Sequence, residues 1–326
     1  MIVRVLLTGG YGCIGSWIIK QIVDSGDTIW VYDLKEDTHR LDLLIDKEVR
    51  EERVRFISGD IADAGGFRSA VESSGATHLL HLAGLQVPSC RSDPMLGART
   101  NVLGTLAVFE AAAALKGQVE RVAYASSAAV HGPGVGGAPI ADEVRLEPRT
   151  HYGAFKVCNE LNARVYWLDR GVSSVGLRPW TVYGVGRDFG VTSEPTKAIK
   201  AVAAGRKYHI SYGGVQDLQY VADVAGLFLR CLGAPGFEGA DAFNVRGDVV
   251  SIETFAATLR SVAPDAQRLI THGDAQLPIA PNLDDSRLRA RFGPLPYTPL
   301  EAGVRDTFER FVRLRDQGRL DVSDLG

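Results

Sequence analysis

The N-terminal strand-turn-helix at residues 3–21 constrains the fold of this chain most strongly. The apolar run Val3–Leu7 is typical of a buried parallel strand, and apolar residues at helical spacing follow the turn at Thr8–Gly15. Glycines in such a turn let backbone N–H groups approach a phosphate, and the N-terminus of a helix attracts anions. We therefore expect a pyrophosphate to bind at Gly9, Gly12, Cys13, Ile14 and Gly15.

An acidic residue, Asp33, ends a second apolar strand at 28–32, about 20 residues beyond the turn. A carboxylate there accepts hydrogen bonds from the adenosine ribose and repels the 2′-phosphate of NADP. This pattern predicts NAD as the cofactor, although Lys35 and Arg40 lie nearby. Asp60 follows a third strand, where it could bind the adenine amine or cap a helix.

Strands and helices alternate up to about residue 182, which predicts an α/β fold. The expected architecture is a Rossmann-type doubly wound parallel sheet with helices on both faces. We expect an NAD-binding domain at 1–182, to which segments near 219–248 return, and a smaller C-terminal α/β substrate-binding domain within 183–326. Within this plan we predict a long helix at 95–115 and a sixth strand at 175–182.

Composition excludes several classes of function. The net charge is −3, the charges are interspersed, and the chain lacks a basic tract for nucleic acid. It also lacks an apolar run long enough to span a membrane and the h-region of a signal peptide. The four cysteines and seven histidines do not have metal-motif spacing. We expect a cytoplasmic protein that acts on a small molecule without a metal.

Three residues form a candidate catalytic set. Ser127 follows the fifth strand, at the sheet edge where open α/β proteins bind ligands. Tyr152 and Lys156 share a helix face at i and i+4. A neighbouring ammonium favours the phenolate, so Tyr152 can take a hydroxyl proton while hydride leaves the same carbon. Ser127 would hold the substrate oxygen, and Lys156 could also bind the nicotinamide ribose. We place Asn101, a polar residue in mid-helix, with this set.

Together these motifs resemble the extended short-chain dehydrogenases/reductases, in particular the NAD-dependent epimerase/dehydratase family. The resemblance covers the whole chain and rests on residues 8–15, 33, 59–61, 81–84, 101–105, 125–132, 152–156 and 177–179. It implies about seven strands in the NAD-binding sheet and a homodimer that packs through the helix of Tyr152 and Lys156. To the cofactor we further assign Tyr152, Lys156, Asp60, Ile61, Leu82, Ala83, Gly84, Ala125, Pro179 and Val182.

Departures from the family pattern narrow the reaction. Ala128-Ala129 follow Ser127 where dehydratases have Asp-Glu, so we do not expect elimination of water. Gln216 replaces an arginine that usually holds the diphosphate of nucleotide sugars, and charged phosphate contacts contribute roughly 1.5–3 kcal/mol each. Arg187, Lys197 or Arg206 could replace that arginine. We otherwise expect a smaller polyol, sugar or sugar acid, bound by some of Gln86, Ser89, Ser127, Arg187, Thr192, Ser193 and Arg246.

Three functions remain after this reading. The first is an NAD-dependent dehydrogenase, and the second is a nucleotide-sugar 4-epimerase that works through a transient ketone. The third is an NAD-binding sensor without turnover, which the presence of Ser127, Tyr152 and Lys156 disfavours. His131 replaces a tyrosine common in the family, and we expect it to pack rather than to act in catalysis.

Overall fold

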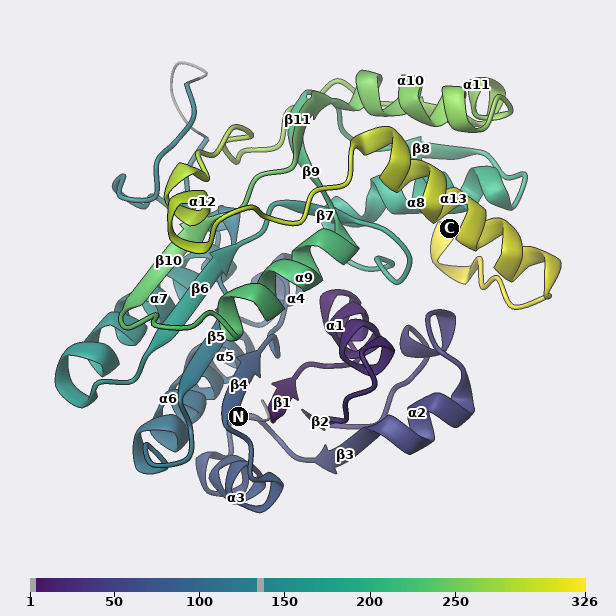
Figure 1. Ribbon diagram of the computed structural model, residues 1–326. Coiled ribbons are helices and arrows are strands. Elements are labelled where there is room, and N and C mark those ends of the chain that lie inside the picture. Colours follow the sequence, from purple (N-terminus) through teal and green to yellow (C-terminus); the bar gives the residue numbers. More distant parts are fainter. Residues whose placement is uncertain (1–3, 134–137) are drawn as a thin grey trace.

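A seven-stranded parallel sheet forms the centre of the computed structural model, which describes residues 4–133 and 138–326 (Figure 1). The strands lie in the order β10-β6-β5-β4-β1-β2-β3. Their bounds are β1 (Val5–Thr8), β2 (Ile29–Asp33), β3 (Val54–Ser58), β4 (His78–His81), β5 (Arg121–Ala125), β6 (Ser174–Arg178) and β10 (Ala240–Asn244). The strand order reverses between β1 and β4. The carboxyl ends of these two strands form the topological switch point, where ligands bind in such sheets.

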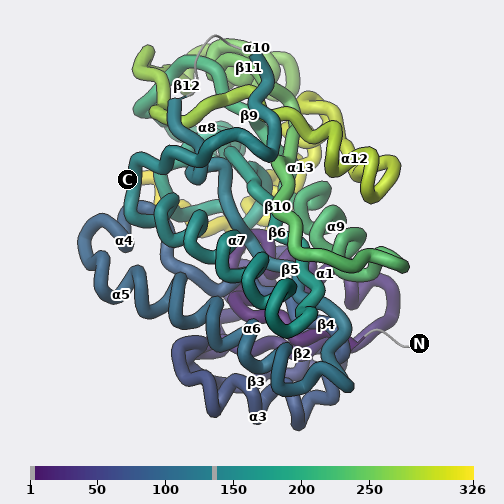
Figure 2. Tube along the Cα trace, turned by 90° about the vertical axis from the view of Figure 1, so that its left-hand side faces the viewer, coloured from purple at the N-terminus to yellow at the C-terminus, as the bar shows by residue number. Residues whose placement is uncertain are grey.

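Helices cover both faces of this sheet, as Figures 1 and 2 show. On one face, α1 (Cys13–Asp24) packs against α9 (Val221–Leu232), and Ile18 and Phe228 are fully buried in that core. On the other face, α3 (Ala64–Ser74), α6 (Gly104–Ala114) and α7 (His151–Arg170) enclose a second core. The expected doubly wound α/β fold is confirmed.

The chain changes sheets directly after β6. The predicted strand at 175–182 is wrong as a single element, because β6 ends at Arg178 and β7 (Thr181–Tyr183) pairs elsewhere. Pro179 cannot donate a ladder hydrogen bond, and the N–H of Trp180 donates to Gln219 instead, over 3.0 Å. β7 pairs with β9 (Val215–Tyr220), which pairs with β11 (Asp248–Ser251).

The rest of the C-terminal part is mostly helical and lies above the central sheet in Figure 2. α13 (Leu300–Asp316) packs on α8 (Glu194–Ala203) and α10 (Ile252–Val262). The smaller elements are β8 (Tyr208–Ile210), α11 (Ala266–Leu269), β12 (Ile270–His272) and α12 (Ser286–Phe292). The division into two domains stays a prediction.

The predicted long helix at 95–115 is interrupted. α4 (Val87–Ser92) and α5 (Pro94–Ala98) precede a π-helical turn at Arg99–Leu103, and α6 begins only at Gly104. Such wide turns often occur at functional sites, and this one carries Asn101.

A short helix, α2 (Lys47–Arg53), precedes β3. Two segments discussed from the sequence lie partly outside the described residues. The predicted strand start at Val3 and residues 134–137 of the Gly/Pro-rich loop are not among the residues described. Within residues 4–133 and 138–326, the helices are too short or too polar to cross a bilayer.

Candidate active site

A cavity of about 630 Å³ opens at the carboxyl edge of the central sheet. Its walls come from the glycine turn after β1, the segments after β4 and β5, the start of α7, and residues 186–192. The volume lies within the range of small-molecule sites in proteins. This is where the sequence motifs converge.

The glycine turn forms one end of the cavity. A Cβ at Gly15 would lie only 2.5 Å from the carbonyl oxygen of Gly9, so this close packing requires glycine. Gly12 is the N-cap of α1, and no side chain of the described residues caps that helix, so the N–H groups of its first turn are available to a phosphate. The turn therefore fits a pyrophosphate. Burial raises the pKa of the Cys13 thiol to about 11, which makes it a packing residue rather than a nucleophile.

Asp33 and Arg40 meet at the backbone of Tyr11. The Asp33 carboxylate accepts from Leu34 N–H over 2.9 Å and from Tyr11 N–H, while burial raises its pKa. Arg40 donates to the carbonyl of Tyr11 and to both carboxylate oxygens of Asp188, with N–O distances of 2.7–3.1 Å. Because Asp188 occupies its guanidinium, Arg40 is not free to bind a 2′-phosphate. The arrangement favours NAD over NADP.

Asp60 does not cap α3. The N-cap is Asp63, whose carboxylate accepts from Gly66 N–H over 3.0 Å, so that interpretation of Asp60 is wrong. Asp60 accepts from Ala62 N–H and pairs with Arg99 over 2.6 Å. Of the residues assigned to the cofactor, those in the cavity wall are Gly9, Gly12, Cys13, Ile14, Gly15, Leu82, Gly84, Ala125, Tyr152, Lys156, Pro179 and Val182. Asp33, Asp60, Ile61 and Ala83 lie outside that wall.

The start of α7 brings the catalytic candidates together. The Thr150 hydroxyl caps the helix at Gly153, where a Cβ would lie 2.3 Å from the carbonyl oxygen of Ala129, so α7 rests directly on the turn that carries Ser127. Burial raises the pKa of Tyr152, while its hydrogen bond with Ser127 and the Arg187 guanidinium lower it. Tyr152 and Ser127 thus share one hydrogen bond inside the cavity wall.

Lys156 lies one turn further along α7 and is only 5% exposed. Its Nζ is 5.6 Å from the centroid of the Tyr152 ring and donates to the carbonyl oxygen of Ala125 over 2.7 Å. Burial lowers the pKa of this ammonium to about 8, and the Glu160 carboxylate opposes that shift. At neutral pH the ammonium therefore stays charged beside the phenol.

Asn101 lies outside the wall of the main cavity. Its amide oxygen accepts from Leu85 N–H over 2.7 Å, and its amide nitrogen donates to Leu85 C=O over 3.0 Å. Its own carbonyl accepts from Thr105 and from Asn159 on α7. Asn101 is 1% exposed and does not line the cavity, so it ties the segment after β4 to α7 rather than contacting a substrate.

A buried charged network holds α7 against β6. Arg178 donates to both carboxylate oxygens of Glu160 over 2.8 Å, and Ser126 donates to the same carboxylate. Asn244 accepts from Arg178 and bonds His131 Nε2 over 2.9 Å. His131 lines the cavity, and burial lowers its pKa. This network fixes the helix face that carries Tyr152.

The substrate candidates fall into two groups. Gln86, Arg187 and Thr192 line the cavity with Ser127, and Arg187 Nη2 donates to Thr192 Oγ1 over 2.9 Å. Ser89, Ser193 and Arg246 do not line it. Ser193 donates to Gly190 C=O within its own turn.

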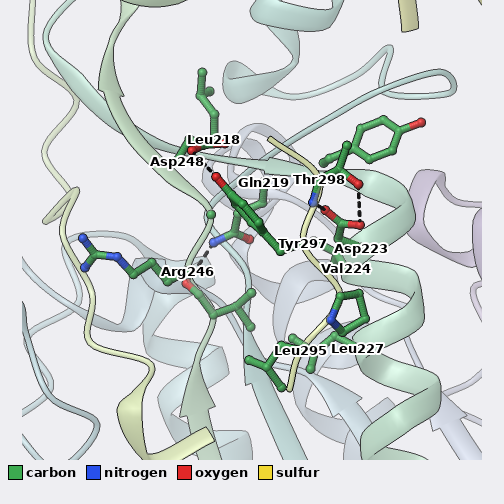
Figure 3. A pocket seen from close by; sticks show the side chains of 14 residues that line it. Leu218, Gln219, Asp223, Val224, Leu227, Arg246, Asp248, Leu295, Tyr297 and Thr298 are labelled. Carbon is green, nitrogen blue, oxygen red and sulfur yellow. Dashed lines mark hydrogen bonds between the residues drawn. The ribbon is translucent and has the colours of Figure 1, made fainter. Parts of the chain in front are cut away.

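Arg246 instead donates to Asn282 and to Leu283 C=O. It borders a second cavity of about 20 Å³, and its side chain extends away from Tyr297 and Asp248 (Figure 3). That space is roughly enough for one water.

Gln216 lies outside the main cavity wall. Its side chain is fully buried in β9, and its Oε1 accepts from the Thr181 hydroxyl over 2.8 Å. The position that often carries a phosphate-binding arginine therefore holds a neutral side chain inside the sheet.

Sequence reasoning missed several residues of the cavity wall. Arg91 and Arg149 add charge to it, and residues 277–279 add an apolar surface beside Trp180, which lies within the expected segment 179–182. Trp180 Nε1 donates to Ala280 C=O over 2.7 Å, across 100 residues of sequence, so no local pattern could have found this wall. Among the described residues, no group of three His, Cys, Asp or Glu side chains is arranged to hold a metal ion.

Residues 5–245 match the model of the "NAD dependent epimerase/dehydratase family". UDP-glucose 4-epimerase of Mycolicibacterium smegmatis is 28% identical over 94% of this chain and 98% of that protein. D-erythronate dehydrogenase of Cupriavidus necator is 28% identical over 61% of this chain and 64% of that protein. The solved UDP-glucose 4-epimerase of Thermus thermophilus, in complex with NAD, is 26% identical with a TM-score of 0.80, over 95% of this chain and 99% of that chain. The predicted family resemblance, the NAD cofactor and the enzyme class are thereby confirmed.

Proposed function

The chain belongs to the NAD-dependent epimerase/dehydratase family, and from this premise we propose that it is a dehydrogenase of small hydroxylated substrates. It would oxidise one carbinol of a polyol, sugar or sugar acid with NAD⁺, or reduce the corresponding ketone with NADH. The substrate binds in the main cavity, beside Ser127 and Tyr152.

Bound NAD⁺ supplies the hydride acceptor for this chemistry. The hydroxyl of Ser127 holds the substrate oxygen within reach of Tyr152. The Tyr152 oxygen takes the hydroxyl proton in the oxidation and returns it in the reduction. Lys156 stays protonated at neutral pH, since its pKa of about 8 lies above 7, and its charge favours the phenolate of Tyr152. Asn101 holds the segment after β4 in place through its hydrogen bond to Leu85, and Glu160 holds α7 against β6 through Arg178.

The observation that carries the proposal is the state of Gln216. It is buried and neutral, so a diphosphate in the cavity would lack the charged contact that nucleotide-sugar enzymes often make from this position. The similarity to a D-erythronate dehydrogenase supports a small substrate as well.

A second candidate function is the 4-epimerisation of a nucleotide sugar. The similarity to a UDP-glucose 4-epimerase over 94% of the chain favours it, because the same Ser127, Tyr152 and Lys156 serve both reactions. In this case Arg91, Arg149 or Arg187 would bind the diphosphate in place of residue 216.

A substrate panel separates the two functions. Alditols, aldonates, uronates, free sugars and UDP-sugars are incubated with NAD⁺ or NADP⁺, and both the reduced cofactor and epimeric products are followed. We expect NADH to accumulate with a small substrate and little use of NADP⁺. Epimerisation of UDP-sugars without net NADH, together with no reaction of the small compounds, would overturn the proposal.

We also propose a homodimer that packs through α7. Leu161, Val165 and Leu168 lie one helical turn apart on that helix and are 50–68% exposed. A second copy that covers this stripe would remove it from water. Light scattering with size-exclusion chromatography should give twice the chain mass. Leu168→Glu should yield monomers, while Arg68→Ser, at an exposed residue of α3, should leave the dimer intact. A monomeric wild-type protein would refute this arrangement.

A further inference from the structure

We propose that Arg187 binds a carboxylate of the substrate, so that the substrate is a hydroxy acid rather than a neutral polyol. This inference rests on the proposed dehydrogenase function and names its substrate class. It follows from the charge of the cavity, the free hydrogen-bond donors of Arg187 and the position of this side chain in the same cavity wall as Ser127 and Tyr152.

The cavity carries an excess of positive charge. Its wall holds Arg40, Arg91, Arg149, Lys156 and Arg187 against the single carboxylate of Asp188, although the whole chain has a net charge of −3. Asp188 neutralises Arg40, and Lys156 serves Tyr152. Arg149 lies 4.0 Å from the Glu147 carboxylate, so Arg91 and Arg187 are the arginines of this wall without a carboxylate within ion-pair distance among the described residues.

Arg187 differs from the other well-ordered arginines in its hydrogen bonds. Arg178 donates four hydrogen bonds, to Glu160, Asn244 and Asp142 C=O. Arg121 donates to four backbone carbonyls through its two terminal nitrogens, although its Nε is also without a partner among the described residues. Arg187 makes one hydrogen bond, from Nη2 to Thr192, and its buried Nε has no partner among the described residues. A buried donor without a partner costs free energy, and a carboxylate can accept from two guanidinium N–H groups at once.

The position of Arg187 suits a group next to the reacting carbon. Its side chain lines the same cavity as the glycine turn, Ser127 and Tyr152. Gln86 lies close to Arg187, because a Cβ on Gly190 would lie 2.1 Å from Gln86 Oε1 and 3.5 Å from Arg187 Nη2. A carboxylate held here leaves the neighbouring hydroxyl at Ser127 and Tyr152, as in a short hydroxy acid. Gln86 would contact the same end of the substrate.

The test compares matched substrates on matched variants. The kcat/KM of the wild-type enzyme is measured with short aldonates and with their alditols, which differ only in the carboxylate, and the Kd of NAD⁺ is measured by fluorescence titration. Arg187→Met should lower kcat/KM for aldonates about 10- to 100-fold and change it little for alditols. Arg187→Lys should restore part of the loss, since it keeps the charge but not the bidentate geometry.

Arg68→Met is the control, because it removes an exposed positive charge on α3, outside the cavity wall. It should retain the preference for aldonates, and circular dichroism verifies that each variant folds. An equal loss with both substrates, or a weaker Kd for NAD⁺ in step with the loss, would assign Arg187 to the cofactor and overturn the inference. Wild-type turnover of alditols without any preference for aldonates would also overturn it, yet leave the proposed function standing. No turnover of aldonates, alditols or any other small compound of the substrate panel by the wild type would instead refute the proposed function itself.

Discussion

Different chemical groups form the two ends of the cavity. The cofactor end consists of backbone and small residues, and a Cβ at Gly15 would overlap the backbone of Gly9 and Gly10. The substrate end consists of long side chains, such as Gln86 and Arg187, on loops after β4 and β7. The first end binds through groups that every residue carries, so its specificity depends on shape. The second end binds through side chains that single substitutions can exchange, which explains how one scaffold serves many substrates.

The largest expected effect lies where the two ends meet. Tyr152→Phe keeps the ring but removes the only proton acceptor proposed at the reacting carbon, so kcat should fall by about 10²- to 10⁴-fold. The Kd of NAD⁺ should stay within about threefold, since the cofactor end keeps its backbone contacts. Steady-state rates and fluorescence titration check both values. Turnover equal to that of the wild type would show that another group moves the proton.

Lys156 should reduce stability near neutral pH. Burial holds its folded-state pKa at about 8, below the unfolded value of 10.5, so the folded state binds fewer protons in that interval. The cost, roughly 3 kcal/mol, is fully present below pH 8 and is relieved as the pH rises toward 10.5. At pH 7 the free energy of unfolding of Lys156→Met, measured by urea titration, should therefore exceed that of the wild type. The gain should be at most the roughly 3 kcal/mol cost, less about 1 kcal/mol for the lost hydrogen bond to Ala125.

The gap between Lys156→Met and the wild type should shrink between pH 8 and pH 10. Lys47→Met, at an exposed residue that pairs with Glu51, serves as control and should show no such trend. A gap that stays constant with pH would contradict a buried, titrating Lys156.

Gly15→Ala tests the cofactor end. The added Cβ meets the carbonyl oxygens of Gly9 and Gly10 at 2.5 and 2.6 Å, and backbone cannot move aside as a flexible side chain can. We expect a loss of about 1–3 kcal/mol in the free energy of unfolding and weaker binding of NAD⁺. At Gly117 an added Cβ would meet nothing within 4 Å, so Gly117→Ala should be neutral by the same urea titration. Equal behaviour of the two variants would mean that the turn adapts.

The smallest expected effect concerns the link between the two ends. Asp188→Asn removes the negative charge that holds Arg40, which lies beside Asp33 through the backbone of Tyr11. The Kd of NAD⁺ should rise a few-fold, and the preference for NAD⁺ over NADP⁺ should narrow because Arg40 becomes available to a 2′-phosphate. Asp24→Asn, at the residue that pairs with Lys20 in the last turn of α1, is the control. An unchanged cofactor preference would argue against the role given to Arg40.

Local patterns predicted much of this molecule. The glycine turn, the parallel strands and the Ser127–Tyr152–Lys156 grouping follow from fixed spacings, because each depends on neighbours within one strand-turn-helix unit. The pairing of Arg40 with Asp188 spans 148 residues, and the contact of Asn101 with Leu85 needs a π-helical turn. Neither leaves a periodic signal.

Arg246 shows the same limit for the candidate site. From the sequence it was as good a substrate-binding candidate as Arg187, yet it donates to Asn282 and Leu283 outside the main cavity. The direction of a long side chain depends on which carbonyls and amides the folded chain brings near it. Spacing in the sequence carries no information about those groups.

The switch of sheets after β6 has a mechanical consequence. Only Pro179 and Trp180 separate β6 in the central sheet from β7 in the other, and hydrogen bonds to Gln219 and Ala280 pin Trp180 at both its backbone and its ring. A rotation of one sheet against the other at this joint would have to break these two hydrogen bonds of Trp180. Pro179 and Trp180 both line the main cavity, so a ligand in that cavity contacts the connection between the two sheets directly.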